Sequence, residues 1–285
     1  MTNNLPGQPA PMPAVTGTTW CLPLVGHPVA QVRTPAGINA WFAECGIDTV
    51  IFPVDIPPDR IAGFFDMLRG WSNCCGCSVT VPHKQAAFAA MDALTERARF
   101  CGAVNIIRRD ADGRLTGDAT DGLAFVRAVE RNGRSIAGSK VLLAGAGGGA
   151  GSAIAHAVCS EGPAEIALLE PHKARRNAIT ARITAKWPEI RCTASPEGAD
   201  YDLAINASAQ GMLPTDEMPF DPRLVRQDGL VADVITKPVT TALLASAEAL
   251  GLKTQNGFEM ADAQLEFQMR HLRLWTERNA TERDD

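Results

Sequence analysis

Short apolar segments alternate with longer amphipathic ones in the first part of the chain, beginning at Trp20. Uncharged apolar runs of this length are typical of buried strands, and the segments between them have the apolar spacing of helices. The expected elements are strands at 21–25, 50–54 and 78–81 and helices at 35–45 and 58–71. Thr34-Pro35 places a capping residue before a first-turn proline, as at many helix starts. The alternation predicts an α/β layer with a mostly parallel sheet.

A hairpin and a second alternating series follow. Two short segments, 104–108 and 114–117, flank Asp110-Ala-Asp-Gly113 and predict a hairpin at the edge of the first sheet. The second series predicts strands at 140–144, 165–169, 202–206 and 230–235 and helices at 150–160, 173–186 and 240–250. A last amphipathic helix is expected from Gly257 to Glu277, packed back on the first domain.

The two series predict two domains, and a length of 285 residues supports that number. The expected division is a leader without fixed structure at 1–19, a substrate-binding catalytic domain at 20–121 and 255–285, and a Rossmann dinucleotide-binding domain at 122–254. No stretch reaches the roughly 20 apolar residues of a membrane span, and the first residues do not resemble a signal peptide. We therefore expect a cytoplasmic location and no membrane partner.

Charge and cysteine content narrow the partners further. A net charge of −5 without a basic run argues against nucleic acid and favours a small-molecule partner. The eight cysteines are scattered through apolar segments, which suits reduced core residues. A metal site would also explain the cluster of Cys74, Cys75 and Cys77, but no second cysteine pair or spaced histidine pair completes a tetrahedron. No metal is therefore expected.

Glycines crowd the turn after the strand at 140–144, in the sequence Gly145-Ala-Gly-Gly-Gly-Ala150. Glycine at 145 permits a tight turn, glycine at 147 lets backbone N–H groups approach a pyrophosphate, and a small residue at 150 lets helix and sheet pack closely. A flexible linker would also be rich in glycine, but linkers do not follow apolar strands. The turn between strand and helix predicts a nicotinamide dinucleotide site and hence an oxidoreductase.

The end of the next strand carries an acidic residue, Glu170. Such a side chain accepts hydrogen bonds from the 2′-hydroxyl of the adenosine ribose and repels a 2′-phosphate, so NAD is the expected cofactor. Lys173, Arg175 and Arg176 follow and could bind that phosphate, which leaves NADP as the alternative. A simple helix-terminus charge would also explain Glu170.

Polar residues gather at strand ends in the first series. Ser78, Thr80 and Lys84 are expected at the same rim of the sheet, and Asn105 and Asp121 stand where apolar residues would be expected. A lysine with a carboxylate is a workable acid/base pair for moving a proton at an alcohol carbon. Taken singly, the lysine is better explained as a solvated helix residue, and the aspartate is equally well explained as a helix cap.

Longer motifs connect these residues. They are Gly26-His-Pro28, Thr34-Pro35, Val79-Thr-Val-Pro-His-Lys84, Gly102-Ala-Val-Asn105, Gly117-Asp-Ala-Thr-Asp121-Gly122, Gly145-Ala-Gly-Gly, Ile205-Asn-Ala-Ser-Ala-Gln-Gly211-Met212, Asp233-Val-Ile235 and Gly257-Phe-Glu-Met260-Ala-Asp-Ala-Gln264. In their order and spacing the chain resembles shikimate dehydrogenases over nearly its whole length. The resemblance implies an open α/β substrate domain, a Rossmann domain, and reversible oxidation of a ring hydroxyl of shikimate, quinate or a related cyclic polyol.

The resemblance also implies a role for each matching residue. Lys84 and Asp121 would be the catalytic pair, and Thr80, Asn105 and Gln264 would hold ring hydroxyls. The positions that face the substrate carboxylate are Val32, Thr34 and Ile235. The implied cofactor-binding residues are Gly145, Ala146, Gly147, Gly148, Gly149, Ala150, Glu170, Asn206, Ala207, Ser208, Val234 and Gly257.

The carboxylate site departs from the family pattern, which uses two serines in a Ser-x-Ser-Pro segment and a tyrosine. Here Thr34 retains one hydroxyl, whereas Val32 and Ile235 offer none. Arg33 could replace a donor, although a solvated loop arginine explains it better. Each missing hydrogen bond to a carboxylate costs about 1 to 3 kcal/mol. The substrate is therefore expected to differ from shikimate at this substituent.

Other departures leave further questions open. Ser78 stands where the family has asparagine, and the Asn-Arg-Thr segment of NADP-dependent members is absent after the second Rossmann strand. A dinucleotide-binding sensor or regulatory protein with lost turnover is an alternative to an active dehydrogenase, and a fragment of a bifunctional protein is another. The resemblance is compatible with a monomer and with a homodimer.

Overall fold

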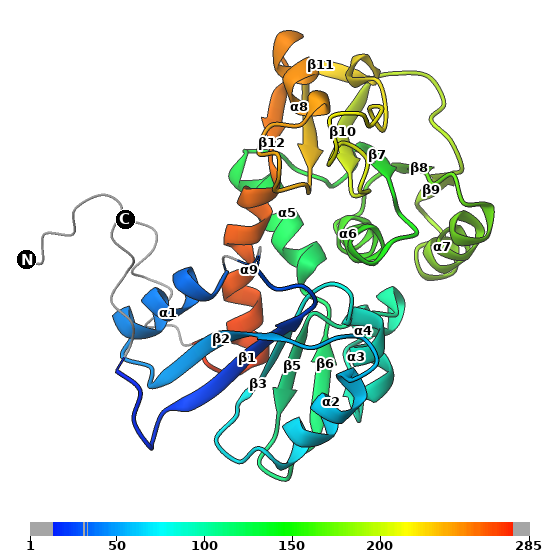
Figure 1. Cartoon of the computed structure of the whole chain (residues 1–285). Helices are drawn as coiled ribbons and strands as arrows, with labels where there is room; N and C mark the ends of the chain where they lie inside the picture. Colours follow the sequence, from blue (N-terminus) through cyan, green and yellow to red (C-terminus); the bar gives the residue numbers. More distant parts are fainter. Residues whose placement is uncertain (1–13, 31, 33, 276–285) are drawn as a thin grey trace, which may run out of the picture. The chain divides into compact units, whose positions relative to one another are not determined.

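The computed structural model describes residues 14–30, 32 and 34–275, and in it the chain forms two compact units (Figure 1). Unit 1 contains the chain up to Leu94, Val104–Asp118 and the chain from Met269 onward. Unit 2 contains Thr95–Ala103 and Ala119–Gln268. Residues 1–13 of the expected leader and Arg33 lie outside the described residues. The domain boundaries expected from the sequence remain a prediction.

Unit 1 is built on a six-stranded sheet, as far as the residues are described, in the order β2-β1-β3-β5-β6-β4. The strands are β1 (Trp20–Gly26), β2 (Thr49–Asp55), β3 (Gly76–Val79), β4 (Ala93–Leu94), β5 (Ile106–Arg109) and β6 (Leu115–Asp118). β1 is parallel to β2 and β3, whereas β5 is antiparallel to β3 and β6. The expected hairpin is therefore present as β5–β6. Its expected edge position is wrong, because β4 pairs with the outer side of β6.

The helices of the first series combine expected and unexpected elements. α1 (Thr34–Glu44) and α2 (Ile61–Gly70) confirm the two expected helices, and each buries several large apolar side chains. The short helix α3 (Lys84–Ala90) begins at the residue where the sequence predicts a helix start, whereas the short helix α4 (Glu96–Cys101) was not expected. The Thr95 hydroxyl caps α4 by accepting the N–H of Ala98 at 3.3 Å, a common start signal that the sequence does contain.

Unit 2 has a sheet of parallel strands in the order β12-β11-β10-β7-β8-β9 within the described chain. Its strands are β7 (Lys140–Ala144), β8 (Glu165–Leu169), β9 (Arg191–Thr193), β10 (Tyr201–Asn206), β11 (Val225–Asp233) and β12 (Lys253–Gln255). Besides α4 and most of α9 (Gly257–His271), it contains the helices α5 (Asp121–Arg131), α6 (Gly149–Ser160), α7 (Lys173–Lys186) and α8 (Ala242–Ala249), with a short 3-10 helix η1 (Pro222–Leu224). This confirms the second alternating series.

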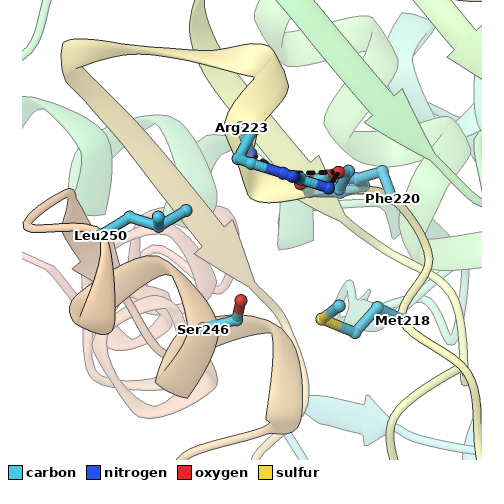
Figure 2. Close-up of a pocket in the computed structure, with 6 residues that line it drawn as sticks. Met218, Phe220, Arg223, Ser246 and Leu250 are labelled. Carbon is cyan, nitrogen blue, oxygen red and sulfur yellow. Dashed lines mark hydrogen bonds and ion pairs between the residues drawn. The ribbon is translucent and has the colours of Figure 1, made fainter.

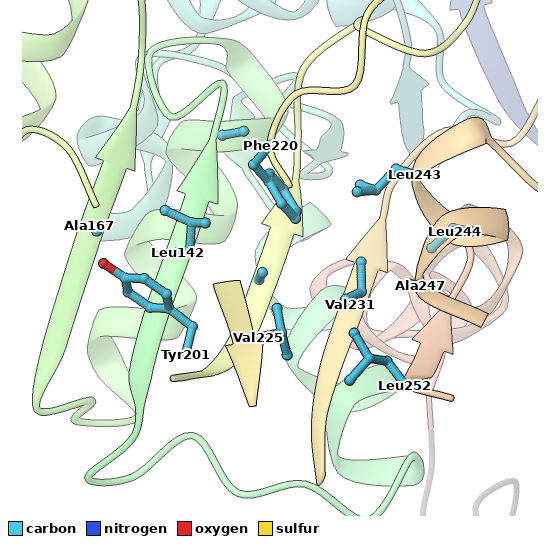
Figure 3. Packing of buried hydrophobic residues seen from close by; sticks show 12 residues of the cluster. Leu142, Ala167, Tyr201, Phe220, Val225, Val231, Leu243, Leu244, Ala247 and Leu252 are labelled. Atoms are coloured by element: carbon cyan, nitrogen blue, oxygen red, sulfur yellow. The ribbon is translucent and has the colours of Figure 1, made fainter. Parts of the chain in front are cut away.

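One face of the unit 2 sheet packs against α8 through a buried apolar cluster (Figure 3). Leu142, Tyr201 and Val231 come from three neighbouring strands, and Leu244 comes from the helix. Full burial of such a side chain contributes about 1.5 to 3 kcal/mol. The cluster fixes α8 on the sheet and so holds the carboxyl ends of β10 and β11 in a defined place.

Helices α5 and α6 approach closely at Gly122. A Cβ placed on this residue would lie 2.1 Å from the carbonyl oxygen of Ala153, which is far inside contact distance. Gly122→Ala is expected to lower the stability by about 1 to 3 kcal/mol through overpacking, seen as a lower melting temperature. Gly63→Ala in α2 is the control, because its Cβ would meet nothing within 4 Å. An unchanged melting temperature for Gly122→Ala would contradict this close packing.

The last helix, α9 (Gly257–His271), ends earlier than expected. The helical pattern of apolar residues continues beyond His271, but Arg273 has a left-handed φ of 61° and stops the helix. Leu272 is buried because its side chain packs at Gly76 of unit 1. Trp275 stacks on Trp41 in the same unit, with ring centroids 5.4 Å apart. The end of α9 and the residues after it thus pack on unit 1, as the sequence predicts.

Candidate active site

The glycine turn lies at the carboxyl end of β7 in unit 2. Gly145 has a φ of 78°, and a Cβ there would lie 2.7 Å from the backbone nitrogen of Ser208. The N–H of Gly148 donates to the carbonyl of Gly145 at 3.1 Å, which closes the turn. Gly148 is the N-cap of α6 and makes no side-chain capping hydrogen bond. The first N–H groups of α6 are therefore arranged as in sites that bind phosphate groups.

The residues of this turn fit a dinucleotide, because added side chains would fill the approach to the backbone. A Cβ on Gly147 would lie 2.6 Å from the Cβ of Arg175 and 2.7 Å from a carboxylate oxygen of Glu170. A Cβ on Gly151 would lie 2.0 Å from the carbonyl oxygen of Gly145. The closest approach of helix and turn is thus at Gly151, one residue beyond the Ala150 position singled out from the sequence.

Glu170 directly follows β8 and lies against the glycine turn. It is buried, and its carboxylate accepts the N–H of Gly147 at 3.0 Å and the N–H of His172 at 3.1 Å. The guanidinium of Arg176 donates to the backbone carbonyl oxygen of Glu170 at 2.6 Å. This carboxylate therefore lies at the carboxyl end of β8, beside the glycine turn.

A buried polar network holds the carboxyl ends of β10 and β11. The amide of Asn206 donates to Asp233 at 3.1 Å, and its oxygen accepts the N–H of Ser208 at 3.1 Å. Asp233 also accepts the N–H of Ile235 at 3.0 Å and the hydroxyl of Thr241 at 2.8 Å. Burial is the main influence on this carboxyl and raises its pKa above the usual value. Sequence reasoning missed Asp233 and Thr241 as site-forming residues.

The positions after β11 face the inside of unit 2. Ile235 is 5% exposed, and its Cδ1 would lie 3.6 Å from a Cβ placed on Gly211. A Cβ on Gly257 would lie 2.5 Å from the carbonyl oxygen of Val234, so the start of α9 approaches this backbone closely. The structure thus gathers Val234, Ile235 and Gly257 with Ala207 and Ser208 at one edge of the unit 2 sheet.

Unit 1 gathers a second group of expected residues after β3. The N–H of Thr80 donates to the carbonyl of Val25 at 2.9 Å, and the N–H of Val79 donates to the carbonyl of Asn105 at 2.8 Å. Lys84 is the half-buried first residue of α3, and its carbonyl accepts the N–H of Val104 at 2.9 Å. The backbone therefore ties Thr80, Lys84 and buried Asn105 to one end of the β3–β5 pair.

The expected carboxylate positions of unit 1 lie at the start of α1. Thr34 is its exposed first residue, and Val32 is half-buried with its N–H donating to the carbonyl of Val29 at 3.0 Å. The hypothesis for Arg33 lies outside the described residues. No hydroxyl or charged side chain stands at position 32, as the sequence shows.

Asp121 and Gln264 meet within unit 2. Asp121 is the buried first residue of α5, and the side-chain amide of Gln264 on α9 donates to its carboxylate at 3.1 Å. Gln264 in turn accepts a hydrogen bond from the side chain of Gln268 at 3.2 Å. Asp121 and Gln264, which the resemblance implies as site residues, are therefore in direct contact. Sequence reasoning missed Gln268.

The cysteine cluster of unit 1 is made of protonated thiols at neutral pH. Burial raises the pKa of Cys74 to about 12 and that of Cys75 to about 12. Within the described residues, no group of three or more His, Cys, Asp or Glu side chains is arranged to hold a metal ion. The same part of the chain contains no helix long and apolar enough to cross a membrane.

A cavity of about 530 Å³ lies on unit 2 (Figure 2). It is lined by Met218, Phe220, Asp221, Arg223, Ser246 and Leu250. These residues belong to the connection between β10 and β11 and to α8 and its end. None of the cofactor-binding residues expected from the sequence is among them. Asp221 and Arg223 also pair with each other, with 2.9 Å between a carboxylate oxygen and the guanidinium.

The parallel sheet, the glycine turn and the acidic residue after β8 define unit 2 as a dinucleotide-binding unit of the Rossmann class. The fold is α/β throughout, with a second sheet in unit 1. Residues 24–107 match the family model described as shikimate dehydrogenase substrate binding domain.

Relatives extend this match over most of the chain. The chain is 34% identical to the shikimate dehydrogenase (NADP(+)) of Rhodospirillum rubrum over 255 residues, which are 86% of this chain and 89% of that one. It therefore belongs to the shikimate dehydrogenase family. Shikimate dehydrogenases are oxidoreductases. This membership does not favour the alternative of a dinucleotide-binding sensor or regulatory protein.

Two solved structures are similar over nearly their full length. Shikimate 5-dehydrogenase from Listeria monocytogenes, in complex with shikimate and NAD, is 27% identical with a TM-score of 0.82, covering 95% of this chain and 97% of that one. The ligand-free 5-ketofructose reductase of Gluconobacter sp. strain CHM43 is 28% identical with a TM-score of 0.81, covering 92% of this chain and 95% of that one.

Proposed function

We propose that this protein reversibly oxidises a ring hydroxyl of shikimate, quinate or a related cyclic polyol with a nicotinamide dinucleotide. The observation that supports this most is the glycine turn, where a Cβ on Gly147 would lie 2.6 Å from the Cβ of Arg175. This turn occurs in a chain that belongs to the shikimate dehydrogenase family. The bound cofactor would accept or supply the hydride. The preferred cofactor is NAD, with NADP as the alternative.

Lys84 and Asp121 form the acid/base pair in this proposal. The Nζ of Lys84 takes the proton from the reacting hydroxyl oxygen during oxidation and returns it during reduction. The carboxylate of Asp121, which already accepts a hydrogen bond from Gln264, holds a substrate hydroxyl as an acceptor. Thr80, Asn105 and Gln264 hold the remaining hydroxyls, which orients the reacting carbon.

We further propose that the substrate lacks the carboxylate of shikimate or carries another group there. Thr34 offers one hydroxyl, Val32 and Ile235 offer none, and the Ile235 side chain is turned toward Gly211 and buried. The similar Gluconobacter protein is a reductase of 5-ketofructose, a polyhydroxy ketone without a carboxylate. Neutral cyclic polyols and ketoses are therefore the preferred class.

The test follows the absorbance of the reduced nicotinamide at 25 °C with NAD and NADP. The panel contains shikimate, quinate, inositols and simple cyclohexane polyols, with 5-ketofructose for the reverse direction. We expect turnover with at least one member and higher kcat/KM for a neutral substrate than for shikimate. Absence of turnover on the whole panel would contradict the proposed reaction, and equal or higher efficiency with shikimate would contradict the substrate class.

Glu170 is expected to set the cofactor preference. Glu170→Gln keeps an oxygen that accepts the N–H of Gly147 but removes the charge that repels a 2′-phosphate. The ratio of kcat/KM for NAD over NADP is expected to fall about tenfold, which corresponds to about 1.4 kcal/mol. Glu161→Gln, at the exposed end of α6, is the matched control. An unchanged ratio would show that Glu170 does not read the ribose.

We also propose a cytoplasmic location and a chain that binds neither nucleic acid nor a membrane. The eight cysteines are free thiols, the state that a reducing compartment maintains. The net charge of −5 is unfavourable for nucleic acid.

A further inference from the structure

Two glutamine side chains on α9 form a chain of hydrogen bonds that ends on Asp121. Gln264 and Gln268 are one helical turn apart and lie on the same face. The Nε2 of Gln268 donates to the Oε1 of Gln264 at 3.2 Å, and the Nε2 of Gln264 donates to the Oδ1 of Asp121 at 3.1 Å. All three belong to unit 2. The catalytic carboxylate of the proposed function is therefore linked to a residue that no substrate role requires.

The direction of this chain follows from its carboxylate end. An ionised carboxylate only accepts hydrogen bonds, so Gln264 must turn its NH₂ group toward Asp121 and its oxygen away. That oxygen then needs a donor, which the NH₂ group of Gln268 supplies. If the Gln264 amide were turned by 180°, its oxygen would face the Asp121 oxygen and repel it.

The side chain of Gln268 carries a buried oxygen that lowers its contribution to the stability of the fold. Its side chain is 3% exposed, and its Oε1 is buried without a hydrogen-bond partner among the described residues. A buried unpaired acceptor costs about 1 to 3 kcal/mol. A methionine of similar size would avoid that cost, so the amide is not explained by its effect on folding.

We propose that Gln268 is a positioning residue that fixes the orientation of the Gln264 amide toward Asp121 and the substrate. This inference rests on the proposed roles of Asp121 and Gln264. Gln268 itself touches neither the substrate nor the cofactor in this scheme. Its removal leaves the oxygen of Gln264 without a donor, and the amide then populates orientations that no longer donate to the carboxylate.

The kinetic test compares Gln268→Met with a matched buried amide. Gln255→Met is the control, because Gln255 is also buried with an unpaired side-chain atom in unit 2 but has no link to Asp121. Gln268→Met is expected to lower kcat about three- to thirtyfold, with an unchanged KM for the dinucleotide and an unchanged or higher melting temperature. Gln255→Met is expected to keep kcat. An unchanged kcat for Gln268→Met overturns the inference.

A double-mutant cycle separates positioning from packing. If Gln268 acts only through Gln264, the double variant Gln264→Met/Gln268→Met loses no more kcat than Gln264→Met alone. Independent, additive losses would overturn the positioning role. Gln268→Leu repeats the comparison in case the methionine variant does not fold.

A spectroscopic readout tests the same inference without any substrate. The side-chain NH₂ resonances of Gln264 are assigned by their loss in Gln264→Met, in ¹⁵N-labelled full-length protein. They are expected to shift in Gln268→Met and in Asp121→Asn, and to stay in place in Gln255→Met. Unmoved resonances in Gln268→Met overturn the inference. Shifted resonances in a protein without turnover on the polyol panel would instead overturn the proposed function and leave the amide chain intact.

Discussion

Lys84→Met is expected to lower kcat by about 10²- to 10⁴-fold, the usual contribution of a positioned acid or base. Methionine keeps most of the side-chain stem but cannot carry the proton. The backbone carbonyl of this residue accepts the N–H of Val104 shortly before β5, and this contact does not depend on the side chain. The measurement is initial rate at saturating substrate and cofactor, with the melting temperature as a check.

The matched control for this variant is Lys253→Met, at the exposed start of β12. It removes the same charge from a site without a proposed role and should leave kcat within about twofold. If Lys84→Met kept kcat within the same range, the proton would move by another route and the catalytic assignment would be wrong.

Gly147→Ala is expected to weaken cofactor binding about 10- to 100-fold, which corresponds to the 1 to 3 kcal/mol of a local overpacking. The added Cβ would lie 2.6 Å from the Cβ of Arg175, so the turn must move away from α7. That movement also breaks the hydrogen bond from the Gly147 N–H to Glu170, which holds the turn at the end of β8. Titration of the dinucleotide by fluorescence measures the effect.

Gly63→Ala serves as the control here too, because alanine fits a helix interior and meets nothing within 4 Å. It should leave cofactor affinity unchanged. Full affinity in Gly147→Ala would mean that the dinucleotide does not bind along this turn.

The sequence predicted the elements whose pattern is local. Alternating apolar runs and amphipathic helices predicted both series, and β7, the glycine turn and α6 are present as expected. Short elements such as β4 and α4 were missed, because β4 has two residues and α4 has too few turns to show a period. The end of α9 was placed too late, since buried Leu272 continues the apolar pattern after the helix has ended.

The candidate site divides in the same way. Lys84, Asp121 and the glycine turn carry chemistry that residue type and motif reveal from the sequence. The roles of Asp233 and Gln268 could not be identified from residue type and motif. Each depends on burial and on hydrogen-bond partners that only the structure places beside it. A buried polar residue is recognised as part of a network only when its partners are placed in space.

The account depends most on the claim that a nicotinamide dinucleotide and an alcohol carbon of a polyol exchange hydrogen on this protein. The direct measurement is transfer of deuterium from reduced NAD that carries deuterium at both C4 positions to a ketone of this class, such as 5-ketofructose or a cyclohexanone polyol, detected by mass spectrometry of the product alcohol. We predict label on the carbinol carbon with the wild-type chain and a transfer rate at least about 100-fold lower with Lys84→Met. An alcohol product without label, or no conversion across these ketones, would contradict the account.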